Sequence, residues 1–255
     1  MANLFQFLRW AHIAAGSIAL IVFWIPAIAP KGGRRHVRAG WVYVILMSVV
    51  VGTAFLMSGL SFSMPLAIRR MPDPLLREEF NNFVPNQRVF AIFLAYLATI
   101  TLASGWQGIW AVQTKQDPEK MRTPFSLVLN ASIVFGGVVV LALGIRYGKG
   151  PLIGMSPLGP LLGTVNLRYL LQGPRERMHW WYVHLGSMIS TGITGYTAFV
   201  VFGGARLFPS ILETELRTIL WLLPTLIGVP VIFRLTASYR RKFASPERSV
   251  PVATV

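Results

Sequence analysis

The sequence predicts an all-α bundle of transmembrane helices, and three observations lead to this fold class. The chain of 255 residues is 54% hydrophobic and only 13% charged, whereas soluble domains carry about 25% charged residues. Long apolar runs follow one another along the chain, each near the length of about 20 residues that a helix needs to cross a bilayer. Basic residues collect in the gaps between these runs. We therefore expect the lipid bilayer to surround the protein and to be its main partner.

Seven apolar runs are candidate spans, and they cover residues 4–29, 39–64, 89–112, 124–147, 151–171, 180–202 and 217–236. The fifth run is the weakest, because it contains Pro151, Pro157 and Pro160. A membrane helix tolerates proline where neighbouring groups satisfy the freed backbone atoms. We expect this run either to cross the membrane with a kink or to be partly re-entrant in its first half.

The distribution of charge predicts the orientation of the bundle. With seven crossings, one side of the membrane receives 13 basic and four acidic residues, and the other side receives nine basic and five acidic residues. Because loops rich in lysine and arginine stay in the cytoplasm, the amino terminus is predicted to lie outside and the carboxyl tail inside. This arrangement is typical of a multi-pass protein of the bacterial inner membrane. The same loops account for the net charge of +15, so no nucleic-acid partner is expected.

The chain is predicted to form one transmembrane domain over residues 1–245, followed by a flexible cytoplasmic tail over residues 246–255. Its longest loop, residues 65–88, is then external. Within this loop Asp73-Pro74 is typical of the start of a helix, and Leu75, Leu76 and Phe80 would give that helix an apolar face. We expect this short helix to lie on the membrane surface.

Histidines near the ends of two runs are the strongest candidates for a site, because ionisable residues within membrane spans tend to be functional. His36 precedes the second run and His184 lies near the start of the sixth, so both are predicted at the cytoplasmic end of the bundle. Two histidines from facing helices can hold the iron of a haem b from both sides. Arg34 and Arg35 are then candidate partners of the haem propionates. The alternative interpretation is that these histidines are only solvated helix ends.

The other two histidines fit this hypothesis less well. His12 lies about 27 Å along its helix from Pro30, so we expect it to be far from His36 and without a partner at its own depth. His179 and His184 are five residues apart and do not share a helix face. A chain without cysteine also has no thiolate metal ligands.

Two further classes of function stay open, and the sequence does not decide whether the protein is an enzyme. The protein could be a non-catalytic subunit or assembly factor that packs against other membrane subunits through small-residue helix faces. It could also be a small-molecule facilitator with a path beside the sixth run, which carries Ser187, Thr191 and Thr194. No carboxylate lies within any span, which argues against proton-coupled transport.

Several motifs give the chain a family resemblance. They are His12-x3-Gly16-x2-Ala19-Leu20, Lys31-Gly32-Gly33-Arg34-Arg35-His36-x3-Gly40-x2-Tyr43, His184-x3-Met188, Thr197-Ala198-Phe199-Val200-Val201 and Trp221-Leu222-Leu223-Pro224-Thr225-x2-Gly228-x-Pro230. With them the chain resembles an uncharacterised family of bacterial polytopic membrane proteins, which share a domain of unknown function. The resemblance implies an all-helical membrane architecture and no particular activity. It adds weight to His12, His36 and His184, which match recurrent motif positions of that family.

Overall fold

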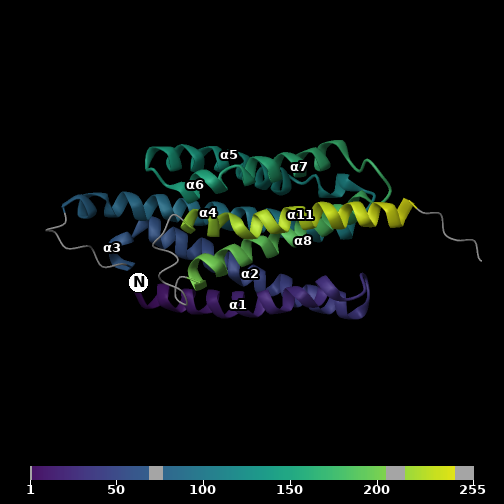
Figure 1. Cartoon of the computed structure of the whole chain (residues 1–255), viewed down its shortest axis with the longest axis horizontal. Coiled ribbons are helices and arrows are strands. Elements are labelled where there is room, and N and C mark those ends of the chain that lie inside the picture. Colours follow the sequence, from purple (N-terminus) through teal and green to yellow (C-terminus); the bar gives the residue numbers. More distant parts are fainter. Residues whose placement is uncertain (1, 69–76, 205–215, 245–255) are drawn as a thin grey trace, which may run out of the picture.

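The computed structural model describes residues 2–68, 77–204 and 216–244, and these residues contain helices and no strand (Figure 1). The long helices are α1 (Ala2–Ile28), α2 (Arg34–Ser63), α4 (Arg77–Thr114), α5 (Pro124–Arg146), α8 (His179–Ala198) and α11 (Leu216–Ala244). Shorter elements are α3 (Pro65–Ile68), η1 (Pro118–Met121), α6 (Gly150–Met155), α7 (Leu158–Gln172) and η2 (Phe199–Gly203). The predicted all-α class is confirmed for the described residues.

Among the described residues, six helices are long and apolar enough to cross a membrane, namely α1, α2, α4, α5, α11, and α8 together with η2. They lie roughly parallel to one axis of the molecule (Figure 1). Large apolar side chains on their outer faces, such as Phe7, Ile21, Phe135 and Phe233, are exposed. A continuous apolar surface of this kind suits lipid rather than water. The chain therefore has the architecture of a multi-pass membrane protein.

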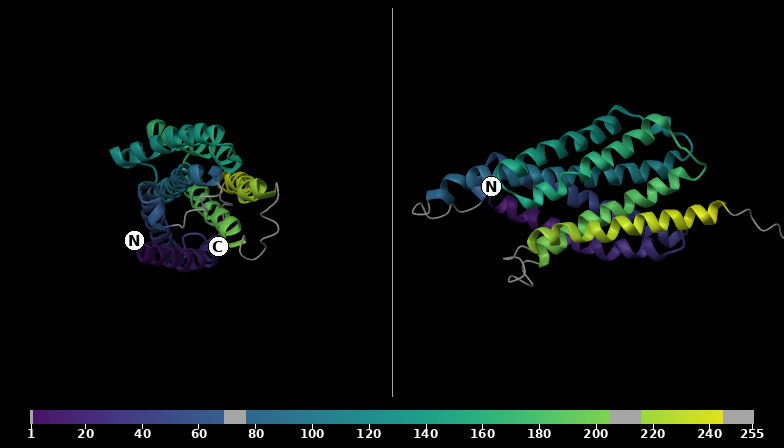
Figure 2. Two further views of the ribbon diagram at one scale, coloured as in Figure 1. Left: turned by 90° about the vertical axis from the view of Figure 1, so that its left-hand side faces the viewer. Right: turned by 45° about the horizontal axis from the view of Figure 1, so that its top comes forward.

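The helices form layers in which α4 and α8 lie between the α1–α2 pair and the α5–α7 pair (Figure 2). Helix α4 contributes most to the core, because Phe93 and Ile100 are almost fully buried against Ile133 and Val140 of α5 and Trp221 of α11. The α8–α11 pair is antiparallel, since Trp181 near the start of α8 stacks on Tyr239 near the end of α11. This arrangement leaves the first turns of α2 and α8 at the same end of the bundle.

The predicted fifth span is divided into α6 and α7, which lie end to end along α5 (Figure 1). Each piece is too short to be one of the six candidate spans. The division has a local cause, because Pro160 has no N–H to donate to the carbonyl of Ser156. The Tyr96 hydroxyl of α4 donates to that carbonyl over 2.8 Å and accepts from the Gly159 N–H over 2.8 Å. A neighbouring helix thus satisfies both the carbonyl that Pro160 leaves free and the Gly159 N–H at the break.

Glycines bring α7 very close to α5. A Cβ atom at Gly159 would lie 2.1 Å from the carbonyl oxygen of Ile133, and one at Gly163 would lie 2.7 Å from the carbonyl oxygen of Asn130. The same interface contains a buried hydrogen bond of 2.8 Å from Asn166 to the side chain of Asn130. Small residues of this spacing let membrane helices pack backbone to backbone, and here they fix the broken helix to α5.

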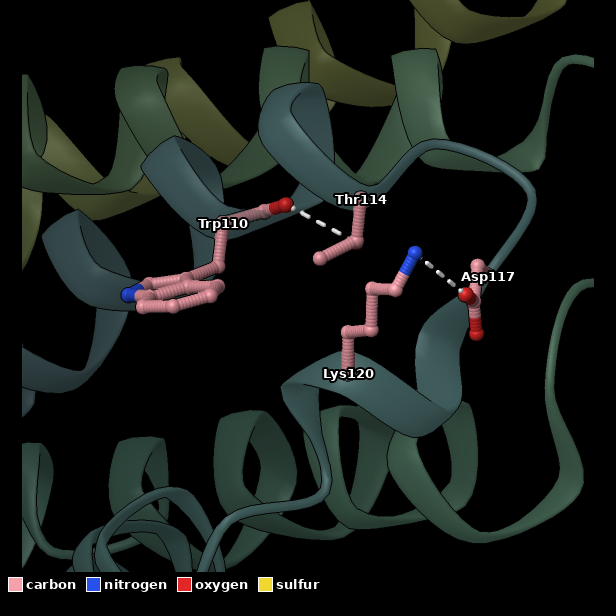
Figure 3. A network of polar contacts seen from close by, with 4 residues as sticks. All are labelled: Trp110, Thr114, Asp117 and Lys120. Carbon is pink, nitrogen blue, oxygen red and sulfur yellow. Dashed lines mark hydrogen bonds and ion pairs between the residues drawn. The ribbon is translucent and has the colours of Figure 1, made fainter.

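An arginine ties the loop between α4 and α5 to the end of α7. Figure 3 shows two local contacts of this loop, the ion pair between Lys120 and Asp117 at 2.9 Å and the hydrogen bond from Thr114 to the Trp110 carbonyl at 2.9 Å. Lys120 lowers the pKa of Asp117 below its ordinary value, but such an exposed pair adds little stability. Arg122 instead donates to the carbonyls of residues 170 and 171 over 3.0 Å each, and so it caps the end of α7.

The predicted external loop differs from expectation in its second half. Asp73-Pro74, Leu75 and Leu76 lie outside the described residues, as does the predicted tail 246–255. The described residues 77–88 are the first three turns of α4 and run without a break into the apolar span. The helix is therefore longer than the span of residues 89–112, because hydropathy marks only the part of a helix that lipid surrounds.

Candidate functional site

His36 and His184 meet at one end of the bundle. His36 lies in the first turn of α2 and His184 in the second turn of α8. Their ring centroids are 6.2 Å apart, and the ring planes make an angle of 69°. The structure thus brings together the two residues that the sequence proposed as a pair, from helices that are almost 150 residues apart in the chain.

A backbone carbonyl fixes each of these imidazoles. His36 Nδ1 lies 3.0 Å from the Pro26 carbonyl of α1, and His184 Nδ1 lies 2.9 Å from the Gly108 carbonyl of α4. Because a carbonyl oxygen can only accept, Nδ1 is the donor in both rings. In the neutral imidazole this leaves a lone pair on Nε2. Metal-binding histidines show the same pattern, in which the second nitrogen is held by a carbonyl or carboxylate.

The two rings border a small cleft of about 100 Å³ between α1, α2 and α8. Tyr43 of α2 and Thr191 of α8 share a buried hydrogen bond of 2.9 Å two turns deeper in the bundle, and Tyr43 also lines the cleft. A Cβ atom at Gly40, one turn after His36, would meet nothing within 4 Å. The cleft is therefore open beside the histidines and closed towards the centre of the bundle.

Lys31 is the cation that lines this cleft. Its ammonium group donates to the carbonyls of Pro26 and Ala27 over 2.8 and 2.5 Å, and burial lowers the pKa of Lys31 below its ordinary value. Gly32, with a φ of +77°, turns the chain back so that Lys31 faces the end of α1. Arg34 and Arg35 are the propionate partners expected from the sequence, but both side chains are exposed and neither lines the cleft. In the sequence, the glycine pair after Lys31 was the feature that could have pointed to a turn placing this lysine beside the cleft.

The remaining histidines lie outside the cleft. His12 Nδ1 lies 3.0 Å from both the Val50 carbonyl and the Thr53 hydroxyl of α2. His179 accepts a hydrogen bond of 3.0 Å from the backbone N–H of Arg175 at Nδ1. In its neutral form His179 therefore carries its proton on Nε2, which is the reverse of His36 and His184.

From the part of the chain that the structure describes, the cleft receives two imidazole ligands and no carboxylate. Over residues 2–68, 77–204 and 216–244, no group of three or more histidine, aspartate or glutamate side chains could hold a metal ion. Two protein ligands are few for a bare Zn²⁺ or Mg²⁺ ion, but they match the two axial positions of a haem iron. Comparisons of this chain with protein-family models, with curated proteins and with solved structures found no match.

Proposed function

We propose that this protein is a membrane redox protein that binds haem b, with the iron held between Nε2 of His36 and Nε2 of His184. The observation that carries the proposal is the separation of 6.2 Å between the ring centroids. With metal–nitrogen bonds of about 2.0 Å, two imidazoles on opposite sides of one metal ion have centroids about 6 Å apart. The carbonyls of Pro26 and Gly108 hold both rings in the tautomer that this ligation requires.

A haem iron with two imidazole ligands has no open position, so the chemistry that it would supply is the transfer of single electrons. Lys31, which lines the cleft, would pair with a propionate. The cleft of about 100 Å³ is smaller than ordinary cofactor pockets of about 300–1,000 Å³. Haem binding therefore requires α1, α2 and α8 to part beside Gly40, where a Cβ atom would meet nothing within 4 Å.

The absorption spectrum of protein produced with a supply of haem tests the proposal. We expect a Soret band in the wild-type protein, and we expect His36→Ala and His184→Ala each to abolish it, because each removes one axial ligand. His12→Ala and His179→Ala are the matched controls and should keep the band, since neither ring lines the cleft. A wild-type protein without a Soret band contradicts the proposal and leaves the subunit, assembly-factor and facilitator interpretations. A band that survives in both cleft variants also contradicts it.

We further propose that the chain crosses the bacterial inner membrane seven times, with its amino terminus outside and its tail in the cytoplasm. Two observations support this. The pieces α6 and α7 together lie along α5 (Figure 1), and their backbone break is satisfied by Tyr96. The predicted cytoplasmic side also carries the larger excess of basic residues.

Cysteine labelling tests this topology, because the chain contains no cysteine of its own. Arg146 and Arg175 are both exposed and lie before α6 and after α7. In intact cells we expect an impermeant maleimide to label Arg146→Cys but not Arg175→Cys, and inverted vesicles should give the reverse. Equal labelling of both variants from one side would show that α6 and α7 do not cross.

A further inference from the structure

A second concave surface lies on the lipid-facing side of α5 and α7, well away from the histidine cleft. This groove has a volume of about 430 Å³ and is lined almost entirely by apolar side chains, including Phe135 and Val138 of α5 and Leu167 and Leu171 of α7. Phe135, Val138 and Leu171 are exposed, so the groove is open to whatever surrounds the bundle. In a membrane that surrounding is lipid acyl chain.

One end of the groove is basic. Arg168 lines it and is exposed, and it takes part in neither of the two ion pairs formed among the described residues. Gln172 lines the same end, and it accepts a hydrogen bond of 3.0 Å from the guanidinium of Arg175. Arg168 lies four residues before the end of α7, about 6 Å from it. A guanidinium near the membrane edge with no acidic partner among the described residues favours an anion at this position.

We propose that this groove binds one anionic phospholipid, with an acyl chain along the apolar floor and the phosphate at Arg168. The lining residues of α7 extend from Thr164 to Gln172, a length of about 12 Å, which suits the first half of an acyl chain. The basic end lies on the side of the bundle where the predicted cytoplasmic loops gather, and basic sites between helices on that side bind anionic headgroups. The inference does not depend on haem.

Native mass spectrometry of the purified protein, with added phosphatidylglycerol or phosphatidylcholine of the same acyl chains, tests this inference. We expect the wild-type protein to retain phosphatidylglycerol more strongly. Arg168→Gln should lower that retention about fivefold, as expected for one arginine at a lipid headgroup, and should leave phosphatidylcholine unchanged. Arg146→Gln, an exposed arginine at the other end of α5, is the matched control and should behave like the wild type. Equal retention of the two lipids, or no effect of Arg168→Gln, overturns the proposal.

A second variant tests where the acyl chain binds. Thr164 is exposed in the groove, so Thr164→Phe should fill the floor and lower the retention of both lipids while the thermal transition stays near that of the wild type. Inorganic phosphate should not displace phosphatidylglycerol, because inorganic phosphate has no acyl chain to bind in the groove. Displacement by phosphate, or full retention in Thr164→Phe, would show that the acyl chain lies elsewhere.

Discussion

Gly159→Ala is expected to destabilise the bundle by about 3 kcal/mol, near the upper end of the usual cost of overpacking a core. The added Cβ atom would lie 2.1 Å from the Ile133 carbonyl oxygen and 2.6 Å from the Tyr96 hydroxyl. The nearest atom belongs to the backbone of α5, so relief requires α7 to move away from α5. That movement would also strain the nearby hydrogen bond between Asn166 and Asn130.

Thermal unfolding in detergent, followed by circular dichroism, measures this effect. A loss of about 3 kcal/mol should lower the transition by about 6–12 °C in a domain of this size. Gly52→Ala is the matched control, because Gly52 also lies within a helix and a Cβ atom there would meet nothing within 4 Å. Alanine has the higher helix propensity, so this control should be neutral or slightly stabilising. Equal transitions in the two variants would show that α5 and α7 are not in close contact.

Tyr96→Phe is expected to cost about 2 kcal/mol, because it removes the hydroxyl that serves two backbone groups at the break between α6 and α7. The Ser156 carbonyl and the Gly159 N–H each lie 2.8 Å from this hydroxyl. Leaving a buried polar group without a partner costs about 1–3 kcal/mol. The loss should be concentrated at the break, so hydrogen exchange of the Gly159 amide should become faster than that of amides in α5.

Tyr169→Phe provides the comparison for this second prediction. The Tyr169 hydroxyl is buried and has no hydrogen-bond partner among the described residues, so its removal leaves no group unsatisfied. We expect the stability of Tyr169→Phe to equal or slightly exceed that of the wild type. Denaturant unfolding of Tyr96→Phe and Tyr169→Phe measures the change in stability of each variant. If the two substitutions have the same effect, the hydroxyl of Tyr96 does not support the broken helix.

The sequence by itself determined which segments are helical, although α4 (Arg77–Thr114) begins before its predicted span of residues 89–112. In lipid a spanning segment must satisfy its own backbone, so long apolar runs become helices whatever their neighbours are. The break near Pro157 and Pro160 was also predictable, because a missing N–H is a local property of proline. The depth of each histidine in the membrane was also predictable, because the rise per residue of a helix placed His36 and His184 at one end of the bundle.

Tertiary structure alone decided which side chains face one another. The rotation and tilt of each helix are set by packing against its neighbours and not by hydropathy. That packing brings the rings of His36 and His184 to 6.2 Å, gives His12 a partner on α2 and places Lys31 at the cleft instead of Arg34 or Arg35. Each of these contacts depends on the angle between two helices, and an apolar run seen alone carries no information about that angle.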